Sequence, residues 1–220
     1  TGQLWAPAAG GVYLWNEGAW QWVPIPVPRV GDDTAATVIT PTTPVRPVRT
    51  GKLLLLLPDQ LIALSMGRGG QPRVETLQTA ARAGIGQFLD CYVNREGYLW
   101  ISGQRGLARA ELPARSVQPE TPWRSWFTPQ EWELTGLWGL TEDAWGHLGM
   151  MASRQDGTMR AVEFDGAQWS AGPELPPHVF RAWYGPGHAL WAVSTNRLWR
   201  FDQQQNAWIV EESCPARELY

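Results

Sequence analysis

The chain has 220 residues, with 18 Lys and Arg, 21 Asp and Glu and a formal net charge of −3. It therefore lacks the basic footprint of a nucleic-acid-binding domain. Fifteen Trp and an apolar fraction of 44% exclude a disordered tail or linker, because disordered segments contain few aromatic residues. The most apolar run, residues 53–57, is stopped by Pro58. Since a membrane-spanning helix needs about 20 apolar residues, no transmembrane segment is predicted.

A short motif of Gly, one variable residue and Leu returns along the whole chain. Its occurrences are Gly2-Gln3-Leu4, Gly51-Lys52-Leu53, Gly97-Tyr98-Leu99, Gly146-His147-Leu148 and a looser Gly187-His188-Ala189-Leu190 with one extra residue. Successive leucines of the motif lie 42 to 49 residues apart. A period of this length is typical of propellers and other repeat architectures.

Two further features follow the motif in most units. A second apolar residue stands eight positions after the leucine in four units, at Val12, Leu61, Leu107 and Leu198, and eleven positions after it at Met159. A turn that leads to a Trp comes third, at Trp20, Trp169 and Trp208. Each unit thus consists of short apolar segments separated by turn residues, which predicts strands joined in a meander. The best helical pattern, from Val74 to Ala83, is expected to be a loop or a turn or two of helix.

Four strands in each unit of about 45 residues predict an all-β fold, a β-propeller built from four-stranded antiparallel blades. The expected single domain, 1–220, divides into units 1–35, 36–84, 85–130, 131–177 and 178–213, and the first unit begins at its second strand. Residues 214–220 would supply the missing strand and close a five-bladed ring, which we favour. Alternatively, the chain is part of a larger propeller of six to eight blades.

The Pro-rich stretch from Pro24 to Pro47 does not read as a central strand, because Pro lacks the backbone N–H of a sheet ladder. We expect a long loop between blades around a short strand at residues 37–40, or alternatively a partner-binding arm. Cys91 lies in an apolar segment and is expected to be a buried small residue. The chain has two cysteines, Cys91 and Cys214, which are too few for a disulfide scaffold and too far apart in the sequence for a zinc site. Their redox state stays open.

The Trp residues fall into two groups. Six occupy two repeated positions and are expected to pack between blades: Trp5, Trp100, Trp191, Trp20, Trp169 and Trp208. Trp123, Trp126 and Trp132 lie between the third and fourth units and do not all map onto repeat positions. They are core residues or, if exposed, ligand-binding residues that stack on a sugar ring or anchor a protein partner.

The residues 94–102, Asn-Arg-Glu-Gly-Tyr-Leu-Trp-Ile-Ser, followed by Gly106-Leu107-Ala108-Arg109, resemble the two-component regulator propeller repeat. The segment 143–149 resembles the first half of that repeat. The chain departs from the pattern where Asn94 replaces an acidic residue, where Ser102-Gly103 stands for Gly-Thr and where Gly149 replaces the Trp. The resemblance implies a seven-bladed sensor module outside the cytoplasmic membrane, attached to a kinase that reports on an external ligand such as a carbohydrate.

A periplasmic or extracellular location is therefore expected. The start of the chain shows no charged segment followed by an apolar one, as a secretory leader would. Because the first residue is Thr1, the chain has been processed, trimmed or cut from something longer, and export remains open.

The loops between second and third strands should share one face of a propeller, where ligands commonly bind. Their candidate ligand-binding residues are Asp59, Gln104, Arg105, Arg154, Asn196 and Arg197. Three arginines on one face would suit a carboxylate, a phosphate or an acidic partner through forked hydrogen bonds. Solvated loops are also polar without binding anything, so both interpretations stay open.

Catalytic and metal sites are not predicted. Glycoside hydrolysis needs two carboxylates at a fixed separation; Asp143 is explained by the repeat, and nothing pairs Asp90, Glu133 or Glu142. His147 and His188 occupy nearly the same repeat position and are expected in equivalent turns, far apart. No metal and no cofactor is therefore expected.

The function that the sequence favours is a non-catalytic, sensor-type propeller that binds a ligand or a protein. The expected partner is a protein or a carbohydrate-like or anionic small molecule, and not a nucleic acid. A scaffold subunit of a larger assembly is the first alternative, and a polysaccharide-active enzyme is the second.

Overall fold

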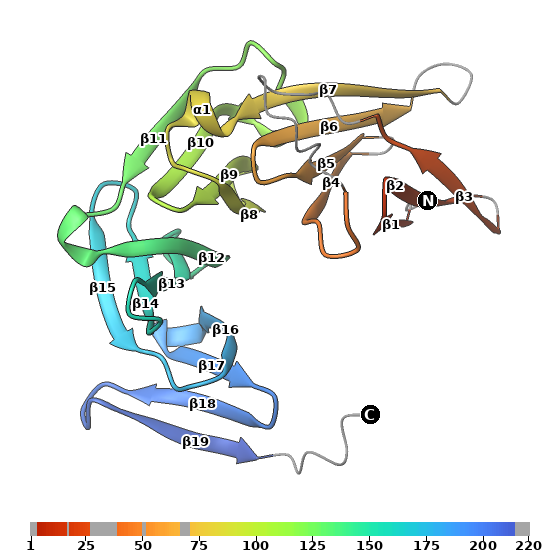
Figure 1. Cartoon of the computed structure of the whole chain (residues 1–220). Helices are drawn as coiled ribbons and strands as arrows, with labels where there is room; N and C mark the ends of the chain where they lie inside the picture. Colours follow the sequence, from red (N-terminus) through yellow and green to blue (C-terminus); the bar gives the residue numbers. More distant parts are fainter. Residues whose placement is uncertain (1–3, 17, 27–38, 50–51, 67–70, 214–220) are drawn as a thin grey trace. The chain divides into compact units, whose positions relative to one another are not determined.

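The computed structural model describes residues 4–16, 18–26, 39–49, 52–66 and 71–213. In these ranges the chain is all-β, and its strands form five antiparallel sheets (Figure 1). The sheets fall into two compact units, Thr1–Trp126 and Phe127–Tyr220. No helix in the described ranges is long and apolar enough to cross a membrane.

The first unit holds three sheets, each a meander of consecutive strands with the orders β1-β2-β3, β4-β5-β6-β7 and β11-β10-β9-β8. Their strands are β1 (Leu4–Ala8), β2 (Gly11–Asn16), β3 (Ala19–Pro24), β4 (Val45–Arg49), β5 (Lys52–Leu56), β6 (Gln60–Met66), β7 (Pro72–Thr79), β8 (Phe88–Val93), β9 (Tyr98–Gly103), β10 (Gly106–Pro113) and β11 (Trp123–Phe127). A short helix, α1 (Ala80–Ala83), follows β7, and a 3-10 turn, η1 (Ala114–Ser116), follows β10.

The second unit holds two sheets with the same meander order, β12-β13-β14-β15 and β16-β17-β18-β19. Their strands are β12 (Leu134–Glu142), β13 (Leu148–Arg154), β14 (Met159–Phe164), β15 (Trp169–Glu174), β16 (Val179–Tyr184), β17 (Leu190–Ser194), β18 (Arg197–Asp202) and β19 (Ala207–Ser213). Two 3-10 turns, η2 (Gln130–Trp132) and η3 (Pro186–His188), precede β12 and β17. These meanders confirm the predicted four-stranded antiparallel blade.

The first sheet has three strands in the described part of the chain, and its β1 contains the repeat leucine Leu4. This agrees with the expectation that the first unit begins at its second strand. Residues 214–220, expected as the closing strand, lie outside the described residues. The closed five-bladed ring and the single domain over 1–220 therefore stay predictions.

In two local segments the described residues differ from the prediction. Thr37 and Val38 lie outside the described residues, and Ile39 and Thr40 are not in a strand. The second sheet instead begins with β4, which follows a turn in which the Thr43 N–H donates to the Thr40 carbonyl, 3.0 Å. β4 tolerates Pro47 because it is the edge strand of its sheet.

The segment from Val74 to Ala83, expected to be a loop or a turn or two of helix, is mainly strand. β7 takes up residues 72–79 and pairs with β6, with Val74 opposite Leu64. Helix α1 covers only the last four residues; the Thr79 hydroxyl caps it by accepting from the Arg82 N–H, 3.2 Å, and Gly84 ends it at φ 72°. Pairing with a neighbouring strand thus overrides the local helical pattern.

The leucine run of β5 forms the centre of the first unit. Residues 53–57 are all buried, and alternate side chains belong to two different hydrophobic clusters. Leu54 and Leu56 pack with Ile101, whereas Leu53 and Leu55 pack with Val12. Each such burial stabilises the fold by about 1.5–3 kcal/mol. The strand is therefore covered on both faces, as its continuous apolar sequence predicts.

Cys91 and most of the repeated Trp residues lie where the sequence predicts. Cys91 is fully buried in the first unit, and Trp100 is also buried. In the second unit, the Trp208 side chain joins the core and donates a hydrogen bond to the Glu174 carbonyl, 2.7 Å. Trp20 contradicts the prediction of burial: it is 50% exposed, and its ring contacts Tyr13 and Trp15 of its own sheet.

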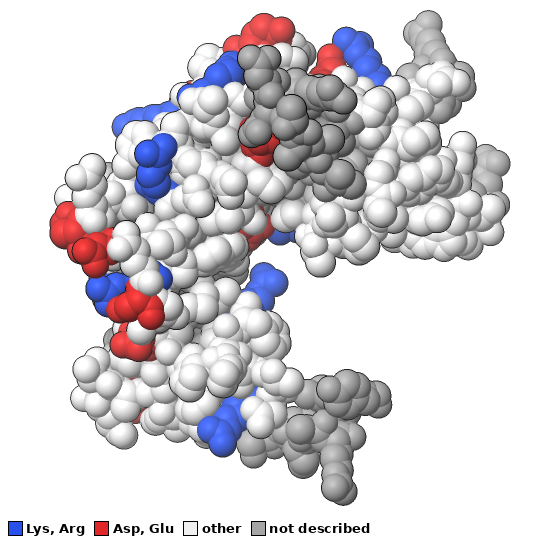
Figure 2. Space-filling model, viewed as in Figure 1, with Lys and Arg blue, Asp and Glu red and all other residues white. Residues whose placement is uncertain are grey.

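Charged side chains are sparse on the face of the molecule shown in Figure 2, where neutral residues make up most of the surface. No continuous basic surface is seen on this face. This distribution agrees with the net charge of −3.

Candidate functional site

The predicted loop residues of the first unit contact the connection between β7 and β8, which belong to two of its sheets. Gln104 accepts a hydrogen bond from the Gln87 N–H, 3.1 Å, and Arg105 donates to the Gly84 carbonyl, 2.8 Å. Asp59 is partly buried, and its Oδ2 receives a hydrogen bond from the Gln60 side chain, 3.4 Å. These contacts give the three side chains a structural role. Their predicted role in ligand binding stays a prediction.

The corresponding residues of the second unit are Arg154, Asn196 and Arg197. Arg154 pairs with Asp156 at 3.5 Å, and the guanidinium of Arg197 lies over the Trp199 ring, 5.4 Å from its centroid. Asn196 and Arg197 line a pocket of about 270 Å³. Arg105 belongs to the other unit, so the predicted convergence of the three arginines stays untested.

Trp123, Trp126 and Trp132 are each partly buried and packed. Trp126 lies against Trp100, with ring centroids 5.2 Å apart, and Trp123 packs against the core of the first unit. The guanidinium of Arg160 lies 6.0 Å from the Trp132 ring centroid. These contacts favour the packing interpretation, although ligand binding by these three residues stays a prediction. The most exposed Trp in the described residues is Trp145, at 63%.

Trp145 belongs to a cluster that begins with the tight turn between β12 and β13. Asp143 Oδ1 accepts hydrogen bonds from the backbone N–H groups of Trp145, 2.8 Å, and His147, 2.9 Å. Gly146 supplies a φ of 90°, which L residues rarely adopt. An Asp followed by such a turn folds locally because its side chain replaces a backbone acceptor.

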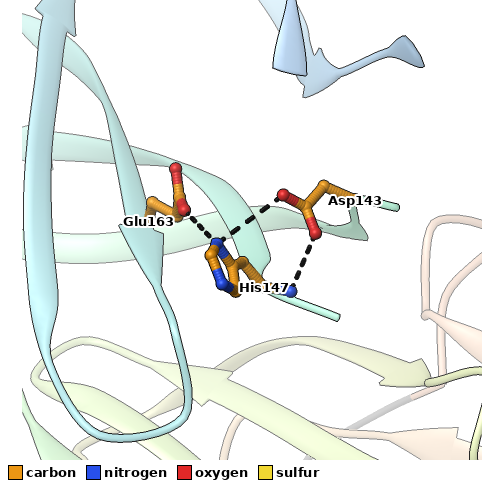
Figure 3. A group of neighbouring side chains, drawn as sticks. All are labelled: Asp143, His147 and Glu163. Atoms are coloured by element: carbon orange, nitrogen blue, oxygen red, sulfur yellow. Dashed lines mark hydrogen bonds and ion pairs between the residues drawn. The ribbon is translucent and has the colours of Figure 1, made fainter. Parts of the chain in front are cut away.

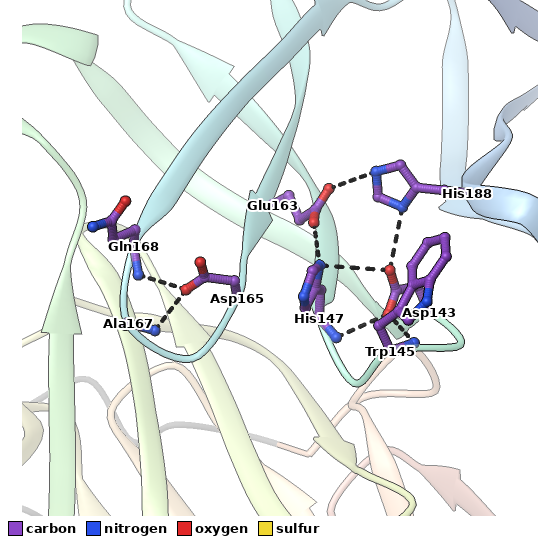
Figure 4. A network of polar contacts seen from close by, with 8 residues as sticks. All are labelled: Asp143, Trp145, His147, Glu163, Asp165, Ala167, Gln168 and His188. Atoms are coloured by element: carbon purple, nitrogen blue, oxygen red, sulfur yellow. Dashed lines mark hydrogen bonds and ion pairs between the residues drawn. The ribbon is translucent and has the colours of Figure 1, made fainter.

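Glu163 and two histidines complete the cluster (Figures 3 and 4). His147 Nδ1 lies 2.6 Å from Glu163 Oε1 and 3.7 Å from Asp143 Oδ2. His188, from η3 of the neighbouring sheet, places Nδ1 3.2 Å from Asp143 Oδ2 and Nε2 3.2 Å from Glu163 Oε2. Both carboxylates therefore contact both imidazoles.

This geometry corrects the expectation that His147 and His188 lie far apart. They do sit in equivalent turns, since each precedes the second strand of its sheet, β13 and β17. The two turns belong to neighbouring blades, and both rings reach the same Asp143 Oδ2. The extra residue in the His188 turn, noted in the sequence, allows the 3-10 turn η3 from which this ring projects.

Tyr184 and Gly149 shape the site together. The Tyr184 ring stacks on the His188 ring, with centroids 4.5 Å apart and planes inclined by 12°. A Cβ atom on Gly149 would lie 2.5 Å from Tyr184 Cδ2. The position where the repeat has a Trp is thus glycine here because the Tyr184 ring occupies the space.

The cluster is buried on its carboxylate side and open on its imidazole side. The Asp143 side chain is 1% exposed, whereas those of His147 and His188 are 33% and 30% exposed. Burial acts to raise the pKa of Asp143, but the N–H donors of His147 and Trp145 and the nearby imidazoles outweigh it, so this pKa lies below 3.8. Burial, followed by the charges of Glu163 and Asp143, raises the pKa of Tyr184 to about 12.

The cluster lies at the opposite end of its sheets from the predicted arginines. In an antiparallel meander, the β12–β13 and β14–β15 turns lie at one end and the β13–β14 turn lies at the other. Asp143 and His147 occupy the first end, beside the turn that Asp165 caps by accepting from the Gln168 N–H, 2.7 Å (Figure 4). Arg154 ends β13 at the other. The predicted ligand-binding residues of this unit lie at the other end, and their role stays a prediction, whereas Gly149 and Glu163 depart from the repeat at this end.

The comparisons with known proteins show the fold. No family model and no curated protein matches the chain. A solved structure of PorZ, a surface component of the type-IX secretion system of Porphyromonas gingivalis, is similar with a TM-score of 0.60 and 12% identity over 91% of this chain and 31% of that chain. A catalytically inactive virginiamycin B lyase from Staphylococcus aureus is similar with a TM-score of 0.53 and 14% identity over 96% of this chain and 64% of that chain.

The extracellular domain of the hybrid two-component system BT3049 from B. thetaiotaomicron is also similar, with a TM-score of 0.50 and 11% identity. The similarity covers 96% of this chain and 33% of that chain. The chain therefore spans between about one third and two thirds of the length of these proteins. The fold is a β-propeller, as the resemblance to the two-component regulator repeat implied.

Proposed function

We propose that this chain is a sensor-type propeller module that binds a small ligand at the Asp143 cluster without transforming it. The observation that carries the proposal is an exposed aromatic ring, Trp145, beside four ionisable side chains that hold one another in place. The Trp145 ring centroid lies 5.2 Å from that of His188. Small-molecule sites combine aromatic side chains with a few fixed polar groups, and both are present here.

The chemistry of the cluster favours a neutral or amino sugar as the ligand. A Trp face stacks on the apolar face of a pyranose ring, and carboxylate oxygens accept hydrogen bonds from hydroxyl or ammonium groups. The two carboxylates, Asp143 and Glu163, disfavour an anionic ligand at this end of the sheets. The carbohydrate-like part of the expected partner chemistry therefore fits this site better than the anionic part.

The contacts of the two carboxylates support a binding role rather than a catalytic one. A retaining glycosidase leaves two carboxyl groups free to face the scissile bond, about 5–5.5 Å apart. Here Asp143 and Glu163 are each engaged by the same two imidazoles. Because one fold neighbour is a lyase, turnover is measured together with binding.

The sensor role and an extracytoplasmic location are parts of the same proposal. They are supported by the resemblance of residues 94–109 to the two-component regulator repeat. The extracellular domain of a hybrid two-component system among the fold neighbours adds support. In this proposal a kinase or another signalling partner responds when the propeller binds its ligand.

A glycan array followed by calorimetry tests the proposal. We expect an immobilised neutral or amino sugar to bind, and Trp145→Ala to weaken the affinity about tenfold or more, which corresponds to about 1.4 kcal/mol. Phe127→Ala is the matched control, because Phe127 is also an exposed aromatic residue, at 57%, but ends β11 and lines neither the Asp143 cluster nor the Arg197 pocket. An affinity for the sugar that is unchanged in Trp145→Ala, or turnover of the bound sugar, contradicts the proposal.

The pocket beside Arg197 favours a second candidate, binding of an anionic ligand as the sequence suggested. Phe180 supplies an apolar wall, and Asn196 and Arg197 supply donors. Loss of binding in Arg197→Ala, with Trp145→Ala unaffected, would favour this pocket. Stable purification of the chain with a protein partner, with no binding of any small ligand, would favour the scaffold alternative.

A further inference from the structure

We propose that Asp143, His147 and Glu163 bind one Zn²⁺ ion, with His188 holding both carboxylates in place. The inference rests on the same cluster as the proposed function but not on the identity of the organic ligand. It begins with three potential ligand atoms, one from each side chain, that lie within 4.8 Å of one another. Figure 3 shows the three side chains pointing toward a common point between β14 and the β12–β13 turn.

The distances suit a small ion after modest side-chain adjustment. His147 Nδ1 lies 2.6 Å from Glu163 Oε1 and 3.7 Å from Asp143 Oδ2. With bonds of about 2.0–2.2 Å, tetrahedral ligands are about 3.3 Å apart. The first distance must therefore lengthen and the second shorten, each by less than about 1 Å, to admit the ion.

The charge of the cluster favours a divalent cation. Among the described residues, the ion-pair partners of Asp143 and Glu163 are His147 and His188. With His147 neutral, His188 donates to both carboxylates only as an imidazolium, which leaves one negative charge with no Lys or Arg ion-pair partner among the described residues. A divalent cation would offset this remaining charge where burial makes it costly.

The donor set points to zinc rather than to calcium or magnesium. Ca²⁺ and Mg²⁺ take oxygen ligands, whereas an imidazole nitrogen combined with carboxylate oxygens suits Zn²⁺. Three protein ligands leave a fourth position open, and the exposed side of His147 gives access to it. A ligand hydroxyl or water can then complete the coordination beside Trp145.

The surrounding contacts orient the ligands as those of metal sites do. Asp143 Oδ1 is held by two backbone N–H groups, whereas Oδ2 has His188 Nδ1 at 3.2 Å and keeps a further acceptor position for the ion. His188 contacts Glu163 Oε2 and leaves Oε1 for the ion. Tyr184 fixes the His188 ring by stacking. His188 is therefore a positioning residue, and such residues typically contribute about 10–100-fold to metal affinity.

Calorimetric titration of the full chain with ZnCl₂, after removal of metal by a chelator, tests the inference. One saturable site is expected, with Co²⁺ giving a visible absorption spectrum from the same site. Glu163→Gln and His147→Ala should each abolish this site, and His188→Ala should weaken it about 10–100-fold. His178→Asn is the control: it removes an exposed imidazole of the same unit and keeps a residue type that tolerates the φ of 63°.

Circular dichroism of each variant separates loss of the ion from loss of the fold, and Glu163→Gln, which keeps the side-chain shape, serves if His147→Ala does not fold. No saturable binding overturns the inference, as does binding that survives both Glu163→Gln and His147→Ala or that is lost equally in His178→Asn. The sugar titration, repeated with chelator, distinguishes the two proposals. Sugar binding that depends on Trp145 without any zinc binding overturns the zinc inference and leaves the proposed function standing.

Discussion

Two turns of the molecule share one backbone design and carry different chemistry. In the first unit, Asn94 Oδ1 accepts from the Tyr98 N–H, 2.8 Å, and the Asn94 N–H donates to the Tyr98 carbonyl, 3.0 Å. In the second unit, Asp143 and His147 make the same two hydrogen bonds, 2.9 and 3.0 Å. The glycine before the last residue has a φ of 86° in one turn and 90° in the other.

The difference lies on the neighbouring strands. Arg109 pairs with Trp100 in the first unit, and Glu163 pairs with Gly149 at the same register position in the second. The guanidinium of Arg109 lies over the Tyr98 ring, 5.1 Å from its centroid, and so packs the surface of its sheet. Glu163 instead contacts His147. A repeated turn thus serves packing in one unit and forms a polar cluster in the other.

Removing the capping side chain of each turn should have the largest effect on stability. The cost should be larger for the turn of the second unit than for that of the first. Asp143→Ala leaves two backbone donors without their acceptor and is expected to cost about 2–3 kcal/mol, against about 1 kcal/mol for Asn94→Ala. Asp143→Asn gives the turn the side chain of its counterpart and should restore most of the stability. Urea denaturation measures all three, and equal costs for the two Ala variants would contradict the comparison.

Filling the space at Gly149 should have the next largest effect. Gly149→Ala places a Cβ against Tyr184 and is expected to destabilise the second unit by about 1–2 kcal/mol, because overpacking outweighs the entropy gained from removing a glycine. Thermal and urea denaturation measure the cost. In a Tyr184→Ala background the same substitution should cost less, and an unchanged cost would show that Tyr184 is not the obstacle.

Cys91 of the first unit is inaccessible, in contrast to the partly exposed imidazoles of the second unit. Burial raises its pKa to about 12, against a smaller opposing effect of Arg46. The neutral thiol therefore stabilises the first unit fully below pH 9, and this contribution is lost as the pH rises from about 9 toward 12. In a Cys214→Ser variant at pH 8, a thiol reagent should modify Cys91 only after urea unfolding. Rapid labelling of the folded chain would show that the residue is accessible.

Asp156 gives the smallest expected effect, at the other end of the second unit. Its pKa is held below 3.8 first by the Thr158 hydroxyl, 2.7 Å away, and then by the Thr158 N–H. The stability that this turn adds is present above about pH 4 and is lost as the pH falls through the lowered pKa. In an NMR titration, Thr158→Val should raise the pKa of Asp156, and no change would refute the hydroxyl's role.

The blades could be predicted from the sequence because they depend on local signals that recur. The Gly-x-Leu motif, the turn residues and the buried run at residues 53–57 are each visible in one dimension. Val74 to Ala83 shows the limit, since its local pattern does not reveal the β6 partner that makes most of it a strand. Trp20 shows another, because its repeat position indicates burial and its surroundings leave it half exposed.

The cluster could not be predicted because its members come from three elements of two blades. The repeat explains Asp143 by itself, yet its second oxygen contacts His188, which is 45 residues away. Two departures from the repeat could have indicated the site. Gly149 replaces the Trp of the repeat, and Glu163 is the residue that pairs with Gly149 on the next strand. A repeat residue that changes together with its cross-strand partner is therefore a better pointer to this site than polar loops are.

The central claim is that the second unit binds its ligand at the Asp143 end rather than at the Arg197 end. NMR of the chain labelled with ¹⁵N at its 15 Trp indoles tests it most directly, since Trp145 borders the first end and Trp199 lies under Arg197. On addition of the sugar identified by the array, the account predicts that the Trp145 signal, assigned with Trp145→Phe, shifts while that of Trp199 stays in place. A shift of Trp199 with Trp145 unchanged would contradict the account.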